Sequence, residues 1–253
     1  MGKYHDYYDK LNLGKKNYEK EIVDLKIIYD QLSSKPLNKI LEIGCGTGNH
    51  TQELIKLTEK VFSVDIDPAM IEIARKKLQG KNVVFHCNKI PNISERDFPL
   101  CVMMWNILNY FPNLKEMNDI FKNISDRLLP GGIFFFDMWN GVAAIKDPPQ
   151  TSANVFEVDG KKVIHILKGE TNLMEQKTDL YTSINVLRDN QLIESFQYDY
   201  THYLWTFKTV KDLLDLNGIE TLRVVKTTNY DVEASDKDWK IMIIARKKVN
   251  GFI

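Results

Sequence analysis

The chain has few cysteines, no excess of either charge and no long hydrophobic run. Its cysteines, Cys45, Cys87 and Cys101, form neither a CxxC motif nor an even disulfide framework, which fits a reducing cytoplasm. No apolar stretch approaches the roughly 18 residues that a membrane span needs, and the polar start MGKYHDYYDK does not resemble a signal peptide. We therefore expect a cytoplasmic protein with no membrane partner.

The charges are balanced, because the chain carries 34 basic and 34 acidic residues. A nucleic-acid-binding protein usually has a basic surplus, so we expect no nucleic-acid partner. A metal enzyme would need His, Cys, Asp or Glu at ligand spacing, and no such grouping is apparent, so we expect no metal. What the chain does have is 253 residues, 43% of them hydrophobic, which is enough for one sizeable core.

Short apolar runs alternate with helical patterns up to about residue 140. Strands are predicted at 39–43, 60–66, 82–87, 100–105 and 131–139, and helices at 49–60, 68–78 and 114–129. Asp67 followed by Pro68 is a typical helix start, with a capping side chain and then a residue already fixed in φ. Regular alternation of strands and helices predicts a parallel sheet covered on both faces.

The pattern changes after residue 150. Two β-prone segments flank Asp159-Gly160 and two more flank Asp189-Asn190, and both pairs are hairpin signals. The chain then returns to a helix at 209–217 and to strands near 220–230 and 240–247. We predict a core formed by residues 1–149 and 206–253, with an inserted antiparallel sheet at 150–205. Exposed strand edges pair readily, so this sheet would also suit a homodimer.

Three glycines follow the first strand in the stretch EIGCGTG, at Gly44, Gly46 and Gly48. A glycine-rich turn that opens a helix lets the backbone approach a ligand closely and presents unpaired N–H groups to it. A tight strand-to-helix connection alone would need only Gly44. The dinucleotide fingerprint G-x-G-x-x-G does not fit, because its third glycine would fall at Asn49. The spacing, with Glu42 just before it, indicates a different nucleoside pocket.

At these residues the sequence resembles the class I S-adenosylmethionine-dependent methyltransferases, whose first motif is an acidic residue, one apolar residue and then G-x-G-x-G. The resemblance implies a Rossmann-like α/β fold, with a doubly wound, mostly parallel seven-stranded sheet and the inserted antiparallel sheet. It also implies S-adenosyl-L-methionine as the cofactor. It covers about residues 1–147 and 205–247, and includes LLPGG at 128–132 and FKTVKDLLDLNGIE at 207–220.

The resemblance assigns a cofactor site residue by residue. Asp65, at the tip of the second strand, is the acid that bonds both ribose hydroxyls, since a carboxylate accepts two hydrogen bonds. Asn88 stands where the family has an Asp that contacts the adenine, which is a departure from the pattern. Asp67 is interpreted instead as a helix cap. The implied cofactor-binding residues are Glu42, Gly44, Cys45, Gly46, Gly48, Asp65, Ile66, Met70, Asn88, Met104 and Trp105.

The methyl acceptor is expected at the carboxyl ends of the fourth and fifth strands, where ligands bind in open α/β sheets. The predicted acceptor-binding residues are Asn109, Tyr110, Trp139 and Asn140. Of the five histidines, His202 is the preferred general base, because it lies just before the late helix. Tyr4 and Tyr8 are further catalytic candidates. The inserted sheet is expected to roof this acceptor pocket.

The resemblance is to small-molecule methyltransferases that act on nucleotide-linked amino sugars, so we expect methylation at N or O of such an acceptor. Two alternatives stay open. One is methylation of a surface or capsule polysaccharide precursor, such as a phosphoramidate group, and the other is a non-catalytic protein that binds S-adenosylmethionine. A nucleic-acid adenine methyltransferase is disfavoured, because DPPQ at 147–150 ends in Gln150 rather than an aromatic residue and does not follow the fourth strand.

Overall fold

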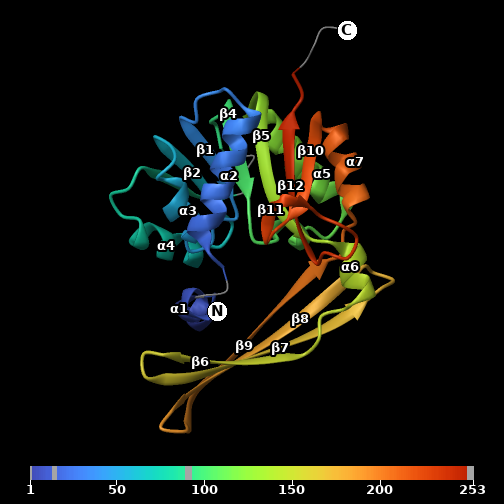
Figure 1. Ribbon diagram of the computed structural model, residues 1–253. Coiled ribbons are helices and arrows are strands. Elements are labelled where there is room, and N and C mark those ends of the chain that lie inside the picture. Colours follow the sequence, from blue (N-terminus) through green and yellow to red (C-terminus); the bar gives the residue numbers. More distant parts are fainter. Residues whose placement is uncertain (1, 13–15, 89–92, 250–253) are drawn as a thin grey trace.

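The computed structural model describes residues 2–12, 16–88 and 93–249. Its main sheet contains the eight strands β1 (Lys39–Ile43), β2 (Lys60–Asp65), β3 (Val83–Cys87), β4 (Phe98–Met103), β5 (Leu128–Trp139), β10 (Ile219–Lys226), β11 (Asn229–Glu233) and β12 (Lys240–Lys247). They are ordered β11-β10-β12-β5-β4-β1-β2-β3 (Figure 1). Strands β1 to β5 pair in parallel, and β12, β10 and β11 continue the sheet in antiparallel fashion. The predicted doubly wound, mostly parallel sheet is confirmed.

The structure adds one edge strand to the seven predicted. Residues 220–230 are not one strand, because the chain turns at Thr227 and Thr228 and β11 returns alongside β10. The pairing of these two strands shifts between Val225 and Lys226. The edge of the sheet is therefore a hairpin, and its turn lies near the candidate site described below.

Helices cover both faces of the main sheet. They are α2 (Tyr18–Leu32), α3 (Asn49–Leu54), α4 (Pro68–Lys77), α5 (Leu114–Arg127) and α7 (Phe207–Leu216). The short helix α6 (Gly141–Lys146) instead lies at the junction with the second sheet, where Ala144 packs with Leu180 and Leu204 (Figure 1). Neighbouring residues of β1 point to opposite faces: Ile40 packs with Leu25 of α2, whereas Leu41 belongs to the cluster that includes Phe121 of α5 and Leu214 of α7. Helix α3 is shorter than predicted, because residues 55–59 form the turn that leads into β2.

A second sheet consists of β6 (Ser152–Val158), β7 (Lys161–Asn172), β8 (Lys177–Arg188) and β9 (Gln191–Tyr203), all antiparallel and in sequence order. Both predicted hairpin turns are present. Asp159 and Gly160, and likewise Asp189 and Asn190, have positive φ angles, as tight two-residue hairpin loops require. The predicted inserted antiparallel sheet is thus confirmed.

Helix α1 (Gly2–Asn12) lies between the main sheet and the second sheet (Figure 1). It packs on β9 and α4, so it joins the two parts of the chain. The sequence analysis predicted no helix here. None of the helices in the described part of the chain is long and apolar enough to cross a membrane.

Candidate active site

A cavity of about 1220 Å³ opens at the carboxyl ends of β1, β2, β4 and β5. The glycine loop after β1 and the residues after β2 form one end of it. Helix α1 contributes Tyr4 and Tyr8, and the second sheet contributes His165, Tyr200 and His202. Because ligands bind at the carboxyl ends of strands in open α/β sheets, this cavity is the candidate site. Pockets for one drug-sized ligand typically have volumes of about 300–1,000 Å³. This cavity is roughly a fifth larger than the upper limit of that range.

The three positions of the loop are occupied by glycine for different structural reasons. A Cβ on Gly44 would come within 2.5 Å of Ile107, and a Cβ on Gly48 would approach Leu78 and Ala74 at 3.2 and 3.3 Å. A Cβ on Gly46 would meet nothing within 4 Å. Gly44 and Gly48 are therefore needed for packing inside the protein. Gly46, which lines the cavity, leaves the space free that a ligand needs to approach the backbone.

Asp65 lies at the tip of β2 and fixes the loop. Its Oδ2 accepts the N–H of Gly46 at 2.8 Å, and its Oδ1 accepts the N–H of Asp67 at 2.9 Å. Burial raises the pKa of this carboxyl, although these N–H bonds act in the opposite direction. A carboxylate offers about four lone-pair sites, so both oxygens can also accept bonds from a ligand. Asp67 is a helix cap as predicted, accepting the N–H of Ala69 at 2.8 Å.

Glu42 is placed differently from the prediction. Its side chain is buried behind the loop and does not line the cavity; it accepts hydrogen bonds from Thr51 at 2.6 Å and Ser63 at 2.7 Å. Burial raises the pKa of Glu42 to about 7. Glu42 thus ties β1 to β2 and α3 rather than presenting its carboxylate to a ligand.

Four more predicted site residues lie outside the cavity lining. Gly48 caps α3, and Met104 is buried in the core beside α2. Asn109 accepts the N–H of Trp139 at 2.8 Å and donates to the carbonyl of Tyr203 at 2.8 Å, which anchors the second sheet to β5. Asn140 caps α6 through the N–H of Val142. The side chains of Asn109 and Asn140 thus make hydrogen bonds within the protein. Residue type and strand position do not reveal such bonds.

The other predicted residues are brought together by the fold. The cofactor-side residues that line the cavity are Gly44, Cys45, Gly46, Asp65, Ile66, Met70, Asn88 and Trp105, and those on the acceptor side are Tyr4, Tyr8, Tyr110, Trp139 and His202. Ile66 is 74% exposed although it is a large apolar residue, which suits contact with the flat face of a base. The role of each of these residues in binding or catalysis stays a prediction.

Aromatic rings surround His202. The ring of Trp139 lies 4.4 Å from that of His202, the ring of Tyr110 4.9 Å away and the ring of Tyr200 5.2 Å away. The ring of Tyr4 on α1 contacts that of Tyr198, with ring centres 3.7 Å apart and planes tilted by 33°. Together these rings form an apolar chamber between α1, β9 and the end of β5.

His202 is an uncharged histidine. Burial, and secondarily the charge of Lys240, lowers the pKa of His202 to about 3. Neither ring nitrogen has a hydrogen-bond partner among the described residues. At neutral pH the imidazole therefore offers one donor and one acceptor to a ligand. Such a low pKa makes the ring a weak base, and the predicted role of His202 as general base stays a prediction.

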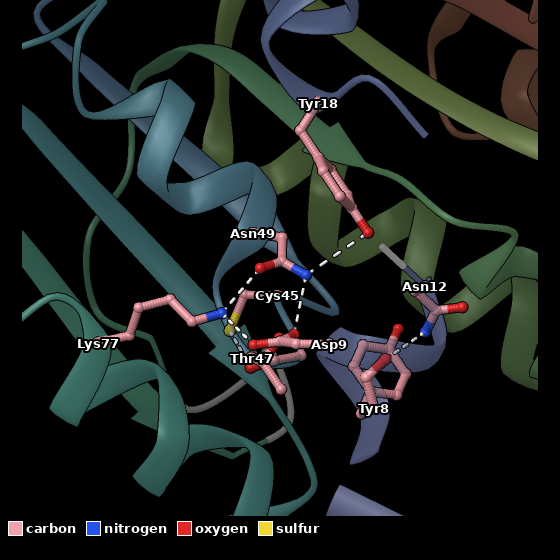
Figure 2. A network of polar contacts seen from close by, with 9 residues as sticks. Tyr8, Asp9, Asn12, Tyr18, Cys45, Thr47, Asn49 and Lys77 are labelled. Atoms are coloured by element: carbon pink, nitrogen blue, oxygen red, sulfur yellow. Dashed lines mark hydrogen bonds and ion pairs between the residues drawn. The ribbon is translucent and has the colours of Figure 1, made fainter. Parts of the chain in front are cut away.

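Helix α1 is held on the glycine loop by one carboxylate, which the sequence analysis did not predict (Figure 2). Asp9 Oδ1 accepts from Thr47 at 2.6 Å and Asn49 at 3.0 Å, and Asp9 Oδ2 accepts from Lys77 at 2.6 Å. Thr47 belongs to the EIGCGTG motif. The contact thus connects the loop at one end of the cavity to the helix that carries Tyr4 at the other.

A strained turn follows β4 at the cavity wall. Trp105 and Asn106 have φ angles of 73° and 57°, in the left-handed region that non-glycine residues rarely adopt. The N–H of Asn106 donates to Asp137 at 2.9 Å, which helps to hold the turn. Strain of this kind costs about 1–3 kcal/mol per residue and concentrates at functional sites.

The N-terminal part of α2 also borders the cavity and was missed. A signal for this helix exists, since Ile22, Leu25 and Ile28 recur at helical spacing and are buried. Asn17 caps it by accepting the N–H of Lys20 at 2.9 Å. The lining residues Glu21 and His50, bonded at 3.1 Å, lie where α2 meets α3.

The family comparison agrees with this geometry. Residues 40–132 match the family described as "Methyltransferase domain", and they contain the glycine loop, Asp65 and the strained turn. This segment is similar to a methyltransferase domain. The predicted resemblance is confirmed for this domain, which runs from β1 into β5.

Curated relatives of the methyltransferase domain differ in their acceptors. A malonyl-[acyl-carrier protein] O-methyltransferase from Bacillus cereus is 32% identical over 114 residues, 44% of this chain and 41% of that protein. A dTDP-3-amino-3,4,6-trideoxy-α-D-glucopyranose N,N-dimethyltransferase from Streptomyces venezuelae is 24% identical over 163 residues, 64% of this chain and 67% of that protein. The chain therefore spans less than half of the first relative and about two thirds of the second.

Solved methyltransferase structures share the whole fold. The superposition on an S-adenosylmethionine-dependent methyltransferase from Clostridium acetobutylicum has a TM-score of 0.81 at 21% identity. It covers 97% of this chain and 98% of that protein. The superposition on an amino pentose methyltransferase from Micromonospora echinaspora, solved with S-adenosylmethionine bound, has a TM-score of 0.77 at 17% identity. It covers 95% of this chain and 96% of that protein. The likeness thus extends beyond the methyltransferase domain to the second sheet.

The residues in the cavity fit S-adenosylmethionine. Open space beside Gly46 admits a ligand against the backbone, Asp65 has lone pairs left for ribose hydroxyls, and the exposed Ile66 suits the adenine. The described part of the chain holds no group of three or more His, Cys, Asp or Glu side chains arranged to bind a metal ion.

Proposed function

We propose that the protein transfers a methyl group from S-adenosyl-L-methionine to a nitrogen or oxygen of a nucleotide-linked amino sugar. The single observation that carries the proposal is one continuous cavity that joins the glycine loop and Asp65 to the aromatic chamber around His202. The similarity of the chain to an amino-sugar N,N-dimethyltransferase supports the choice of acceptor.

When bound, the cofactor supplies a methyl group on a sulfonium, which carries its own leaving group. The protein's own contribution is alignment. The loop and Asp65 hold one reactant, while the rings of Tyr110, Trp139 and Tyr200 confine the other, and fixing two reactants in line can supply about 7–11 kcal/mol. The second sheet and α1 close the chamber, which excludes water from the reacting atoms.

His202 would position the acceptor. Its uncharged ring can accept a hydrogen bond from an acceptor N–H or O–H and so turn the nitrogen or oxygen lone pair toward the methyl group. An amine needs to be neutral in order to react, and the apolar chamber favours that form, because burial disfavours charge. The arrangement therefore suits an amine acceptor without a strong base in the cavity.

The experiment is a methyl-transfer assay with isotopically labelled S-adenosylmethionine and a panel of nucleotide-linked sugars. The panel pairs amino sugars with their hydroxyl counterparts, and includes malonyl-acyl-carrier protein because one relative methylates it. Label in an amino sugar alone would support the proposal. Label in the malonyl thioester, or in no acceptor despite cofactor binding, would refute it.

A further inference from the structure

The cavity extends beyond the chamber to a second polar region. Its lining includes Thr227 and Thr228 of the β10–β11 turn, Tyr230 of β11 and Lys240 at the start of β12. Three of these belong to the β10–β11 hairpin at the edge of the main sheet. The region thus adds space and polar groups that the cofactor loop does not account for.

Lys240 lies next to the acceptor chamber. Its backbone pairs with Trp139, and partners across an antiparallel pair share one face of the sheet. Trp139 in turn contacts His202. The ends of β12 and β2 are four strand spacings apart in the sheet, about 19 Å, so Lys240 starts far from Asp65.

The charges of Asp137 and Glu21 act on Lys240, but both acids lie within ion-pair distance of another lysine. Lys16 pairs with Glu21 at 2.9 Å and lies 4.0 Å from Asp137, while His50 also bonds Glu21. Lys240 has no carboxylate oxygen within 4.0 Å among the residues that the structure describes. Its ammonium lies 5.6 Å from the ring centre of Trp105 and borders the cavity. Burial lowers the pKa of Lys240, so the charged group lacks much of its hydration.

Tyr230 supplies an independent observation. Its side chain is only 5% exposed, it lines the same cavity, and its hydroxyl has no hydrogen-bond partner in the described chain. A buried polar group without a partner is costly, at about 1–3 kcal/mol. Burial and the charges of Glu21, Asp137 and Asp24 raise the pKa of Tyr230, so its hydroxyl keeps its proton and stays a donor. This donor and the Lys240 ammonium line the same cavity, and both are groups that an anion can bind.

We propose that Lys240 and Tyr230 bind an anionic group, a carboxylate or a phosphate, of the methyl acceptor. The inference rests on the proposed function and narrows it to acceptors with an acid group, as the diphosphate of a nucleotide-linked sugar would provide. The bound anion would accept from the Tyr230 hydroxyl and pair with the Lys240 ammonium. The Lys240 charge would also oppose entry of a protonated amine and so favour its neutral, nucleophilic form.

The test uses inorganic phosphate as the probe. Phosphate is titrated by calorimetry into the wild-type protein and the variants K240M and Y230F, with and without S-adenosylhomocysteine. Lys26→Met is the matched control, because Lys26 is on α2 and pairs with Asp30 on the surface. We expect phosphate to bind about tenfold more weakly to K240M and severalfold more weakly to Y230F, with K26M unchanged. Equal binding by K240M and wild type, or no binding to wild type, would overturn the proposal.

A second arm tests whether the cofactor's own carboxylate occupies this site. S-adenosylhomocysteine and 5′-methylthioadenosine, which lacks the amino-acid part, are titrated into wild type and K240M. We expect K240M to bind each compound as wild type does. A selective loss of S-adenosylhomocysteine affinity would assign Lys240 to the cofactor and overturn the proposal. Wild-type protein that binds neither compound would instead contradict the proposed function, while the phosphate titration would still decide the anion site.

Discussion

At the scale of single residues, neighbouring acids after β2 have separate tasks. Both acids line the cavity, but Asp65 bonds the loop, whereas Asp67 caps α4 and pairs with His5 of α1 at 2.9 Å. We expect Asp65→Ala to weaken S-adenosylhomocysteine binding by about 1.5–3 kcal/mol, because a charge-assisted hydrogen bond is lost. Calorimetry measures this directly.

Asp67→Ala provides the matched control for Asp65. Loss of the cap should lower the free energy of unfolding by about 1 kcal/mol. Its effect on S-adenosylhomocysteine affinity should be smaller than that of Asp65→Ala. Equal affinity in wild type and Asp65→Ala would remove Asp65 from the cofactor site.

The buried Glu42 predicts a pH-dependent stability. The pKa of Glu42 is about 7 in the folded protein, whereas the ordinary value is 4.5. The folded state therefore holds the proton more tightly than the unfolded state does. The contribution of Glu42 to the free energy of unfolding is fully present below pH 4.5 and is lost as the pH rises through 7. Relative to Glu42→Gln, wild type should lose about 3 kcal/mol across that interval. Denaturant unfolding at several pH values measures the difference, and a difference that does not change with pH would contradict the assignment.

The free energy of unfolding depends on pH in the opposite direction through His202. Its pKa of about 3 lies below the ordinary 6.5, so the folded state resists protonation, and stability is lost as the pH falls from 6.5 toward 3. We expect nitrogen chemical shifts of the His202 ring to report a neutral imidazole from pH 8 down to about pH 4. His202→Phe, which keeps a ring in the chamber, identifies the signal. Titration of that signal near pH 6.5 would show that the chamber is open to water.

At the scale of elements, α1 is the part that closes the cavity, and Asp9 is its attachment to the loop. Asp9→Asn removes the charge that pairs with Lys77, so the backbone amides of α1 should exchange with deuterium severalfold faster. Lys10→Met is the control, since Lys10 pairs with Asp159 at the surface. Unchanged exchange in Asp9→Asn, or an equal increase in Lys10→Met, would show that Asp9 does not hold the helix.

The sequence predicts those elements whose signals are local. The hairpins at Asp159-Gly160 and Asp189-Asn190 follow from turn residues that tolerate positive φ, and the helix after Asp67 follows from its cap. Helix α1 has no comparable signal, because its half-buried tyrosines pack against β9 or line the cavity and do not pack against a neighbour in sequence. Contacts between distant segments decide such elements.

At the scale of the whole molecule, the fold and the cofactor end of the site were predictable and the acceptor end only in part. A glycine loop must follow a strand to present its backbone, so Gly46 and Asp65 could be placed from their motif. Lys240 and Tyr230 could not, because they reach the cavity only through the order of β12, β10 and β11 in the sheet. Asn109 was predicted to bind the acceptor, but its side chain donates to the carbonyl of Tyr203. That bond could not be predicted either, because Tyr203 is far away in sequence.

The most direct test of the account is hydrogen–deuterium exchange with and without S-adenosylhomocysteine. We expect the ligand to slow exchange at the backbone amides of residues 44–49 and 65–70, which border the cofactor end of the cavity. Exchange in α7, which does not line the cavity, should be unchanged. Binding that protects other segments but leaves the loop and the residues after β2 unaffected, or no binding at all, would contradict the assignment of this cavity as the methyl-transfer site.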